Sequence, residues 1–285
     1  MTAEIINGRE IAEKIKQMVK ITVEEIQEKH HTQPNITTIK IGEDPASNLY
    51  LKLRDKACEK VGINSEHVFY STKVEETEVI NKIHELNQDP EVHGILIQFP
   101  VPEHISQDDL VNAIDPKKDV EGLTPYNMGK TLLGDETIIP CTPLAVIKIL
   151  EHEKISLKGK DITVINHSNI VGKPLAALFL NRNATVTVCH IFTKDLKRHT
   201  EKADIIVTAA GVKELIKKEL IREGCFIIDV AIITSDDGIC GDVDLKDVRA
   251  KAGKVTPVPG GVGPVTVACS LLNMIKTYQN CVEAR

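Results

Sequence analysis

The stretch KDITVINHSNIVGKPLAALFLNR, residues 160–182, reads as a strand, a polar turn and a helix in immediate succession. Its residues 162–165 are apolar or β-branched, as in a buried strand. Pro174 stands in the first turn of the helical part, where its missing N–H is tolerated. Further apolar strands are predicted at residues 184–190, 203–210 and 225–231. Repeated units of this kind indicate a doubly wound α/β domain of the type that binds dinucleotides.

The first half of the chain alternates between helix and strand in the same way. The spacing of apolar residues predicts helices at 8–29, 50–62, 75–86 and 104–114, and strands at 35–42 and 92–100. Residues 115–146 are rich in Pro, Gly and Asp and form either a linker or a functional loop.

A long final helix, residues 265–280, can pack back on the first half of the chain. We therefore predict two domains, residues 1–143 with 265–285 and residues 144–264.

Composition excludes several classes of protein. The chain has 285 residues, a formal net charge of −6 and well-mixed charges, so no basic stripe for nucleic acid is expected. No apolar run approaches the roughly 18 residues of a membrane helix, and the charged N-terminus lacks a signal-peptide core, which predicts a cytoplasmic protein. The seven cysteines are scattered without a CxxC pair, so we expect neither a disulfide framework nor a metal site.

Three features outside the predicted core have the residue types of a ligand site. The loop TPVPGGVGPVT, residues 256–266, has glycines that admit a ligand close to the backbone at the start of a helix. A stiff connection between domains fits its composition equally well. Gln98 lies inside an otherwise apolar strand and needs a partner if buried, although a lone glutamine in a strand is usually structural. The segment DPKKDVEG, residues 115–122, by itself fits a solvated surface loop.

In combination these segments resemble one family across nearly the whole chain. The motifs YLKLRDKACEKVGI, HGILIQFPVP, KKDVEGLTPYNMGK, PCTP, SNIVGKPLAALFLNRNATVTVCH, ADIIVTAAG, GDVD and TPVPGGVGPVTVA occur in this order. The sequence is similar to the bifunctional methylenetetrahydrofolate dehydrogenase/methenyltetrahydrofolate cyclohydrolase family. The resemblance implies an N-terminal α/β domain and a Rossmann-like domain with a cleft between them, and a homodimer. It also implies oxidation of methylene-tetrahydrofolate with NADP, followed by hydrolysis of the methenyl product to formyl-tetrahydrofolate.

The family pattern places a tyrosine four residues before a lysine, matched here by Tyr50 and Arg54. On a helix these two side chains share one face, about 40° apart. By the resemblance, the lysine and a glutamine matched by Gln98 move protons in the hydrolytic step. Arginine cannot lose its proton near neutral pH, and the helix directs Lys52 and Lys56 to other sides. Hydrolysis is therefore predicted to be weak or absent.

The folate-binding residues of the family pattern are matched more closely in this sequence than the proton-transfer residues. By resemblance, the substrate pocket is matched by Tyr50, Gln98, Pro259, Gly260 and Gly261. The family aspartate that grips the pterin corresponds to Glu121, which keeps the carboxylate with one more methylene. We take Tyr50, Arg54, Gln98 and Glu121 as candidate catalytic residues.

The dinucleotide side departs further from the pattern. The candidate cofactor-binding residues are Asn166, His167, Ser168, Ile191, Ala231 and Ile233. By resemblance, an arginine and a serine at the positions of His167 and Ile191 hold the 2′-phosphate of NADP. Histidine is a weaker and pH-dependent substitute, and isoleucine offers no hydrogen bond. We expect NADP or NAD as cofactor, with a weaker preference for NADP than the family pattern implies. The alternative is that the chain no longer binds a dinucleotide.

Three hypotheses about function remain open. The resemblance favours an NAD(P)-dependent folate oxidoreductase with an impaired cyclohydrolase step. A second is a redox-inactive relative that transfers the one-carbon unit of methylene-tetrahydrofolate to another acceptor. A third is a folate-binding subunit without catalysis. Dependence of turnover on a dinucleotide separates the first two.

Overall fold

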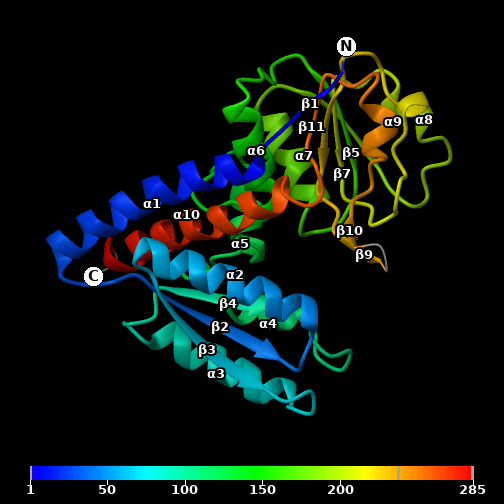
Figure 1. Cartoon of the computed structure of the whole chain (residues 1–285). Helices are drawn as coiled ribbons and strands as arrows, with labels where there is room; N and C mark the ends of the chain where they lie inside the picture. The colour runs from blue at the N-terminus through cyan, green and yellow to red at the C-terminus, as the bar shows by residue number, and fades with distance from the viewer. Residues whose placement is uncertain (1, 236–237, 284–285) are drawn as a thin grey trace. The chain divides into compact units, whose positions relative to one another are not determined.

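The computed structural model describes residues 2–235 and 238–283, and the chain divides into two compact units. Unit 1 comprises Met1–Glu13, Thr131–Gly134 and Thr142–Thr266. Unit 2 comprises Lys14–Lys130, Asp135–Cys141 and Val267–Arg285. The helices α1 (Gly8–His30), α5 (Pro125–Leu132) and α10 (Val262–Glu283) contribute residues to both units (Figure 1).

Unit 1 is built on a parallel sheet of six strands. Their order across the sheet is β1 (Glu4–Ile5), β11 (Lys254–Val255), β8 (Phe226–Asp229), β7 (Ile205–Thr208), β5 (Asp161–Ile165) and β6 (Thr185–Cys189). All neighbouring pairs are parallel. The helical elements are α6 (Cys141–His152), α7 (Gly172–Asn181), α8 (Lys197–Thr200), α9 (Leu245–Val248) and the 3₁₀ turn η1 (Lys218–Leu220). The strands β9 (Ile233–Ser235) and β10 (Gly238–Cys240) form an antiparallel hairpin.

Residues 160–182 contain β5, the polar turn and α7, as predicted. Strand β5 lies between β6 and β7, and Ile162, Val164 and Ile165 are buried. A strand that is buried on both faces is mostly apolar, which explains its lack of alternation, and the hydroxyl of the buried Thr163 donates to the His199 carbonyl at 2.7 Å. The prediction of a doubly wound α/β domain is confirmed.

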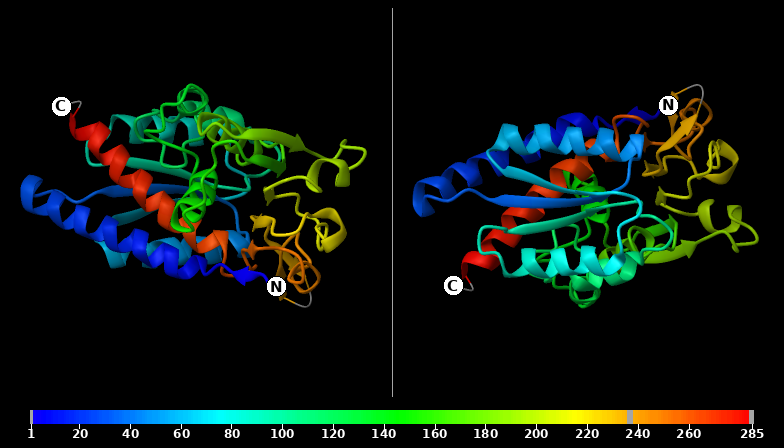
Figure 2. Two further views of the ribbon diagram at one scale, coloured as in Figure 1. Left: turned by 90° about the horizontal axis from the view of Figure 1, so that it is seen from above. Right: turned by 90° about the horizontal axis from the view of Figure 1, so that it is seen from below.

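Unit 2 contains a second parallel sheet, in the order β3 (Asn64–Tyr70), β2 (Asn35–Ile41) and β4 (Gly94–Gln98). On one face Ile39 and Ile95 pack with Ile83 of α3 (Glu76–Gln88) and Leu110 of α4 (Gln107–Ala113). Helix α2 (Pro45–Val61) covers the opposite face, so the three strands lie between α2 and α3 (Figure 2).

The register of the second sheet determines what faces α2. Thr38 pairs with Leu96, and Lys40 pairs with Gln98. Because side chains alternate along a strand, Thr38, Lys40 and Gln98 all point to the face that α2 covers. Polar side chains therefore lie beside the buried Ile36 and Leu96 on one face of the sheet, whose other face is an apolar core.

Some boundaries differ from the sequence prediction. Residues 115–146 are not one long loop, because α5 forms at Pro125–Leu132 and α6 begins at Cys141. Strand β3 was not predicted, since its sequence NSEHVFY is largely polar. Helix α2 starts at Pro45, five residues earlier than expected, but ends at the predicted glycine, Gly62, with a left-handed φ of 81°. In the described residues no helix has both the length and the apolarity of a bilayer crossing.

Candidate functional site

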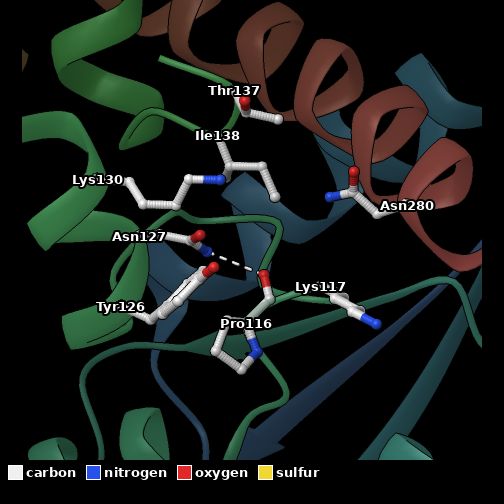
Figure 3. A pocket seen from close by; sticks show the side chains of 8 residues that line it. All are labelled: Pro116, Lys117, Tyr126, Asn127, Lys130, Thr137, Ile138 and Asn280. Carbon is white, nitrogen blue, oxygen red and sulfur yellow. Dashed lines mark hydrogen bonds between the residues drawn. The ribbon is translucent and has the colours of Figure 1, made fainter. Parts of the chain in front are cut away.

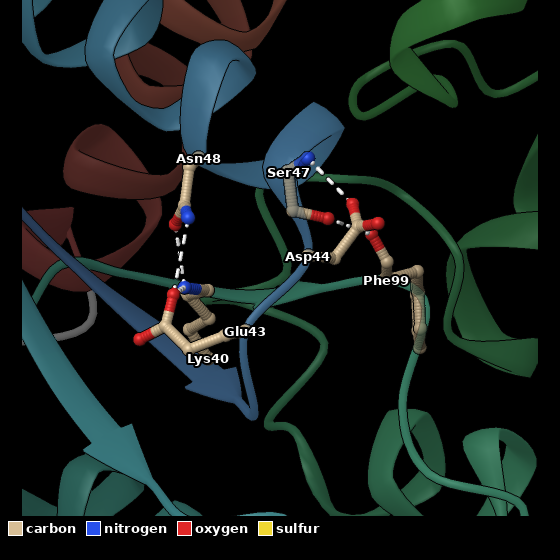
Figure 4. Close-up of polar contacts among 6 residues, drawn as sticks. All are labelled: Lys40, Glu43, Asp44, Ser47, Asn48 and Phe99. Carbon is tan, nitrogen blue, oxygen red and sulfur yellow. Dashed lines mark hydrogen bonds and ion pairs between the residues drawn. The ribbon is translucent and has the colours of Figure 1, made fainter.

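The start of helix α2 is fixed by its own cap and by the end of β4. The Asp44 carboxylate accepts a hydrogen bond from Ser47 N at 2.7 Å, which satisfies an N–H that the helix leaves free. The Ser47 hydroxyl donates to the carbonyl of Phe99 at 3.0 Å. This bond ties the helix that carries Tyr50 and Arg54 to the segment directly after Gln98 (Figure 4).

A second group of polar contacts involves Lys40, a lysine that the sequence analysis did not single out. Its side chain is 3% exposed, and Nζ contacts Glu43 Oε2 at 2.9 Å and also donates to Asn48 Oδ1 (Figure 4). The Asn48 amide donates in turn to Glu43 at 3.0 Å. Lys40 therefore contacts two side chains near the start of α2, and it pairs with Gln98 in the sheet.

Arg54 is completely buried and incompletely hydrogen-bonded. Its exposed fraction is 0%, and Nη2 donates to Thr38 Oγ1 at 2.8 Å. Nε and Nη1 have no hydrogen-bond partner among the described residues. The guanidinium lies over the ring of Tyr50, with Cζ 5.8 Å from the ring centroid. Buried donors without partners are costly, so these two N–H groups indicate a site for a polar ligand or water.

Glu121 lies in a turn that Asp119 holds rigid. Asp119 is 1% exposed, and its carboxylate accepts from Gly122 N and Thr124 N, both at 2.8 Å, and from Asn127 Nδ2 at 2.9 Å. Gly122 has a φ of 69°, and a Cβ there would lie 2.8 Å from the carbonyl carbon of Ile139. The half-buried Glu121 has no hydrogen bond within the part of the chain that the structure describes.

Tyr50, Arg54 and Glu121 lie close enough for the charge of one to shift the pKa of another. Burial raises the pKa of Glu121 to about 7, while the Arg54 charge opposes this rise and Asp119 adds to it. Burial also raises the pKa of the Tyr50 phenol far above its ordinary value, and the Glu121 carboxylate raises it further. The cluster therefore has a permanently protonated phenol, a fixed cation and a carboxyl group that titrates near neutrality.

Gln98 offers an acceptor on the same side of the sheet. Its Nε2 donates to the carbonyl of Phe99 at 3.0 Å, while Oε1 is buried without a hydrogen-bond partner among the described atoms. The predicted residues Tyr50, Arg54, Gln98 and Glu121 all belong to unit 2. Free donors on Arg54 and free acceptors on Gln98 and Glu121 match a flat heterocycle with both kinds of group.

Helix α10 stabilises the turn of Glu121 through hydrogen bonds to the main chain around it. The amide of Asn273 donates to the carbonyls of Val120 and Ile139, at 2.9 and 2.8 Å. Cys141 also donates to the Val120 carbonyl, at 3.3 Å. Burial raises the pKa of Cys141 well above its ordinary value, so this thiol stays neutral. Asn273 and Asp119 were not predicted as site residues, because their partners lie far away in sequence or on the main chain.

Pro259, Gly260 and Gly261 belong to unit 1 and form a tight loop before α10. Gly260 has a φ of 101°, and a Cβ at Gly261 would lie 2.5 Å from the carbonyl oxygen of Pro257. Gly8 at the start of α1 is also packed closely, since its Cβ would lie 1.8 Å from the Gly261 carbonyl oxygen. The shape of this loop thus depends on glycine at these positions.

In unit 1 the turn between β5 and α7 is organised by Asn166. Its Oδ1 accepts from Ser168 N, Ser168 Oγ and Gly172 N at 2.8, 2.7 and 3.1 Å. Its Nδ2 donates to the carbonyl of Ala209 after β7, at 2.7 Å. A Cβ at Gly172 would lie 2.0 Å from the Asn166 carbonyl oxygen. The Asn166 side chain therefore fixes the shape of this turn, and the close approach of its main chain requires glycine at position 172.

The remaining predicted cofactor residues lie in this unit at the ends of its strands. His167 and His190 lie side by side, with ring centroids 4.9 Å apart. Ile191 and Phe192 follow β6 and are 86% and 80% exposed. Ala231 is buried after β8, and Ile233 is half-buried. A dinucleotide fits this edge, since the loop and the start of a helix lie at the carboxyl ends of parallel strands.

A separate pocket of about 300 Å³ lies in unit 2 (Figure 3). It is lined by Pro116, Lys117, Tyr126, Asn127, Lys130, Thr137, Ile138 and Asn280. The charge of Lys130 is balanced by Asp135 at 2.8 Å. None of the predicted site residues lines this pocket. The described residues also contain no group of three or more His, Cys, Asp or Glu side chains suited to a metal ion.

Comparison with known proteins gives matches along nearly the whole chain. A family model described as tetrahydrofolate dehydrogenase/cyclohydrolase, catalytic domain, matches residues 6–121. The NAD(P)-binding domain of the same family matches residues 140–282. The bifunctional protein FolD of Methanosarcina barkeri is 48% identical over 281 residues, 99% of this chain and 96% of that protein.

Two solved structures of similar proteins agree with the fold. The bifunctional FolD methylenetetrahydrofolate dehydrogenase/cyclohydrolase of Campylobacter jejuni has a TM-score of 0.95 and 42% identity, covering 98% of this chain and 99% of that one. The Trypanosoma brucei dehydrogenase-cyclohydrolase, complexed with NADP cofactor and an inhibitor, has a TM-score of 0.94 and 32% identity, covering 99% of each chain.

Proposed function

The chain belongs to the tetrahydrofolate dehydrogenase/cyclohydrolase family, as the motifs predicted, and is an enzyme of tetrahydrofolate one-carbon interconversion. From this premise we propose that it oxidises methylene-tetrahydrofolate to methenyl-tetrahydrofolate with NAD or NADP. In this proposal residues 1–143 with 265–285 form the folate-binding domain, apart from Met1–Glu13, whose strand β1 belongs to the sheet of unit 1, and residues 144–264 bind the dinucleotide. We also retain the predicted homodimer, which sedimentation of the purified protein would test.

The observation that carries this proposal is the set of free polar atoms around Arg54. Arg54 Nε and Nη1 and Gln98 Oε1 are buried without hydrogen-bond partners among the described residues. The pterin ring of a folate has ring nitrogens and a carbonyl that accept, and an amino group that donates. Glu121 and Gln98 suit the donating groups, and Arg54 suits the accepting ones. Bound folate would thus satisfy groups that are otherwise costly to bury.

The oxidation itself requires positioning more than proton transfer. Bound NAD(P) supplies the acceptor for a hydride from the methylene carbon. The chain must hold the folate in a fixed orientation, and Tyr50 together with the hydrogen-bonded turn of Glu121 would provide this contact. Neither requires a lysine at position 54, so the arginine is compatible with the dehydrogenase reaction.

The turn between β5 and α7 is suited to the dinucleotide, but not to strong selection for NADP. Asn166 and Ser168 fix the turn, and the start of α7 can face a phosphate. At the predicted 2′-phosphate position the chain offers His167 and the apolar Ile191 rather than an arginine and a serine. We expect NADP to be preferred over NAD by less than about tenfold, which corresponds to 1.4 kcal/mol.

Initial rates with methylene-tetrahydrofolate and either NAD or NADP test the proposal directly. The expected result is turnover that depends strictly on a dinucleotide. Folate binding without turnover with either cofactor would overturn it. One-carbon transfer to another acceptor in the absence of dinucleotide would support the redox-inactive alternative. No contact among the described residues favours that alternative.

Restoring the family residues should restore selection for NADP. The double change His167→Arg and Ile191→Ser adds a permanent cation and a hydroxyl, each able to bond phosphate. We expect the Kd for NADP to fall at least tenfold in calorimetric titration, while the Kd for NAD changes less than threefold. His152→Arg, an exposed histidine at the end of α6, is the matched control. An equal gain for both cofactors would contradict a 2′-phosphate contact.

A further inference from the structure

The arginine at position 54 raises the question of which group can move a proton during hydrolysis. Tyr50 keeps its proton, because burial raises the pKa of its phenol. Cys141 stays neutral for the same reason. Asp119 is occupied by three hydrogen-bond donors. Of the groups clustered here, Glu121 alone combines a carboxylate without hydrogen bonds in the described residues with partial exposure.

We propose that Glu121 is the proton carrier for hydrolysis of methenyl-tetrahydrofolate in this chain, in place of a lysine. The inference rests on the proposed function, because it assumes that the folate ring lies against Tyr50, Arg54 and Gln98. Glu121 would then be a catalytic residue as well as a ligand for the pterin.

In the proposed hydrolysis, water is the nucleophile and Glu121 both accepts and returns a proton. The oxygen of water forms a bond to the cationic methenyl carbon, the C=N π pair moves to nitrogen, and one water proton goes to the Glu121 carboxylate. The carbon–nitrogen bond of the neutral intermediate then breaks, and the departing nitrogen takes the proton from Glu121. The remaining hydroxyl proton passes through the same carboxylate to solvent. The products are formyl-tetrahydrofolate and one proton.

The surroundings of Glu121 suit this cycle. The groups that face it are Tyr50 and Arg54 from α2, Asp119 from its own turn and the neutral thiol of Cys141, while Cys269 lies near Tyr50. Burial and Asp119 raise the pKa of Glu121, whereas Arg54 lowers it, to a value of about 7. A group with a pKa near the working pH both accepts and returns a proton efficiently. Hydrolysis should therefore increase as the pH rises through about 7, because the carboxylate is the accepting form.

Lys40 is the competing candidate, since it is buried on the same sheet face as Gln98. Its Nζ, however, contacts both Glu43 and Asn48. Both contacts would have to break before Nζ could reach a water molecule beside the folate. Lys40→Arg keeps the charge without a removable proton, and therefore tests this alternative.

The experiment measures hydrolysis of methenyl-tetrahydrofolate and, separately, NAD(P)-dependent oxidation in the same preparations. Glu121→Gln keeps the shape of the side chain but cannot accept a proton. We expect its hydrolytic kcat to fall about a hundredfold and to lose the pH dependence near 7. Oxidation should fall less than tenfold, through weaker folate binding. Glu121→Asp should retain the pH dependence, and Lys40→Arg should retain at least a third of the hydrolytic rate.

The decisive variant is Arg54→Lys combined with Glu121→Gln. If Glu121 carries the proton, the new lysine replaces the missing base, so Arg54→Lys should raise hydrolysis by a larger factor in the Glu121→Gln background than in the unaltered chain. If Glu121 only holds the pterin, Glu121→Gln reduces oxidation and hydrolysis by the same factor, and Arg54→Lys raises hydrolysis equally in both backgrounds. That result, a hundredfold loss in Lys40→Arg, or no hydrolysis by the unaltered protein would overturn the inference. Dinucleotide-dependent oxidation would still stand in each case, which separates this inference from the proposed function.

Discussion

Replacing Arg54 with lysine is expected to raise hydrolysis of methenyl-tetrahydrofolate about a hundredfold or more. A positioned group that gives and takes a proton contributes roughly 10²–10⁴-fold to such a step. Arginine cannot supply this contribution, because its proton is not removable near neutrality. In the unaltered chain Glu121 must both hold the pterin and move the proton. A lysine at position 54 would relieve it of the second task.

The structure makes this substitution well defined. Arg54 is buried, whereas Lys52 and Lys56 on the same helix are exposed. Neither exposed lysine can therefore serve in its place. A lysine at position 54 is shorter and would leave Thr38 Oγ1 without the 2.8 Å bond that Nη2 now donates, so a small loss of stability is expected. At saturating folate the kcat of oxidation with NAD(P) should change less than threefold, because it does not require the removable proton. The KM for folate should rise, because Arg54 Nε and Nη1 are the donors proposed to bind the pterin.

Arg198→Lys, an exposed change of the same chemistry on α8, is the matched control for this measurement. The readout is the rate of disappearance of methenyl-tetrahydrofolate at several pH values. An unchanged rate would place the defect in hydrolysis elsewhere, in the additional methylene of Glu121. Glu121→Asp, alone and combined with Arg54→Lys, would then identify it.

The fold could be predicted from the sequence wherever hydrophobic spacing and end signals agreed. The turn from β5 into α7 and the glycine that ends α2 are examples, since both depend on local conformational preferences. The prediction failed for β3, which is polar on its exposed side, and for the two-residue strands β1 and β11, which are too short to have a pattern. Helix α5 was missed because flanking Pro and Gly residues masked it.

For the candidate site, too, the sequence indicated some features and not others. The family resemblance indicated Tyr50, Arg54, Gln98 and Glu121 as candidates, because each matches a position of a family motif. The sequence could not indicate which atoms remain free, because that depends on partners such as Thr38, whose hydroxyl takes one Arg54 donor. Nor could it indicate that Asp119 holds the turn of Glu121. In isolation the segment around Asp119 resembled a solvated loop, and only the buried hydrogen bonds reveal its structural role.

Replacing Asp119 with alanine is expected to lower the free energy of unfolding by roughly 3–5 kcal/mol. The change leaves Gly122 N, Thr124 N and Asn127 Nδ2 without the carboxylate that now accepts from all three. Each unsatisfied buried donor costs about 1–3 kcal/mol, and neighbouring losses are not fully additive. Urea unfolding followed by circular dichroism measures the effect. Asp108→Ala, an exposed aspartate in the first turn of α4, should change it by less than about 0.5 kcal/mol.

The same variant should also lose activity beyond its loss of stability. Asp119 sets the turn that places Glu121, and a displacement of about 1 Å can reduce catalysis about a hundredfold. We therefore expect oxidation and hydrolysis to fall together by a hundredfold or more, under conditions where circular dichroism shows the protein to be folded. This common loss differs from Glu121→Gln, which should affect hydrolysis far more than oxidation. If folded Asp119→Ala kept normal rates, the turn would not be what positions Glu121, and its carboxylate would have to be held by the substrate itself.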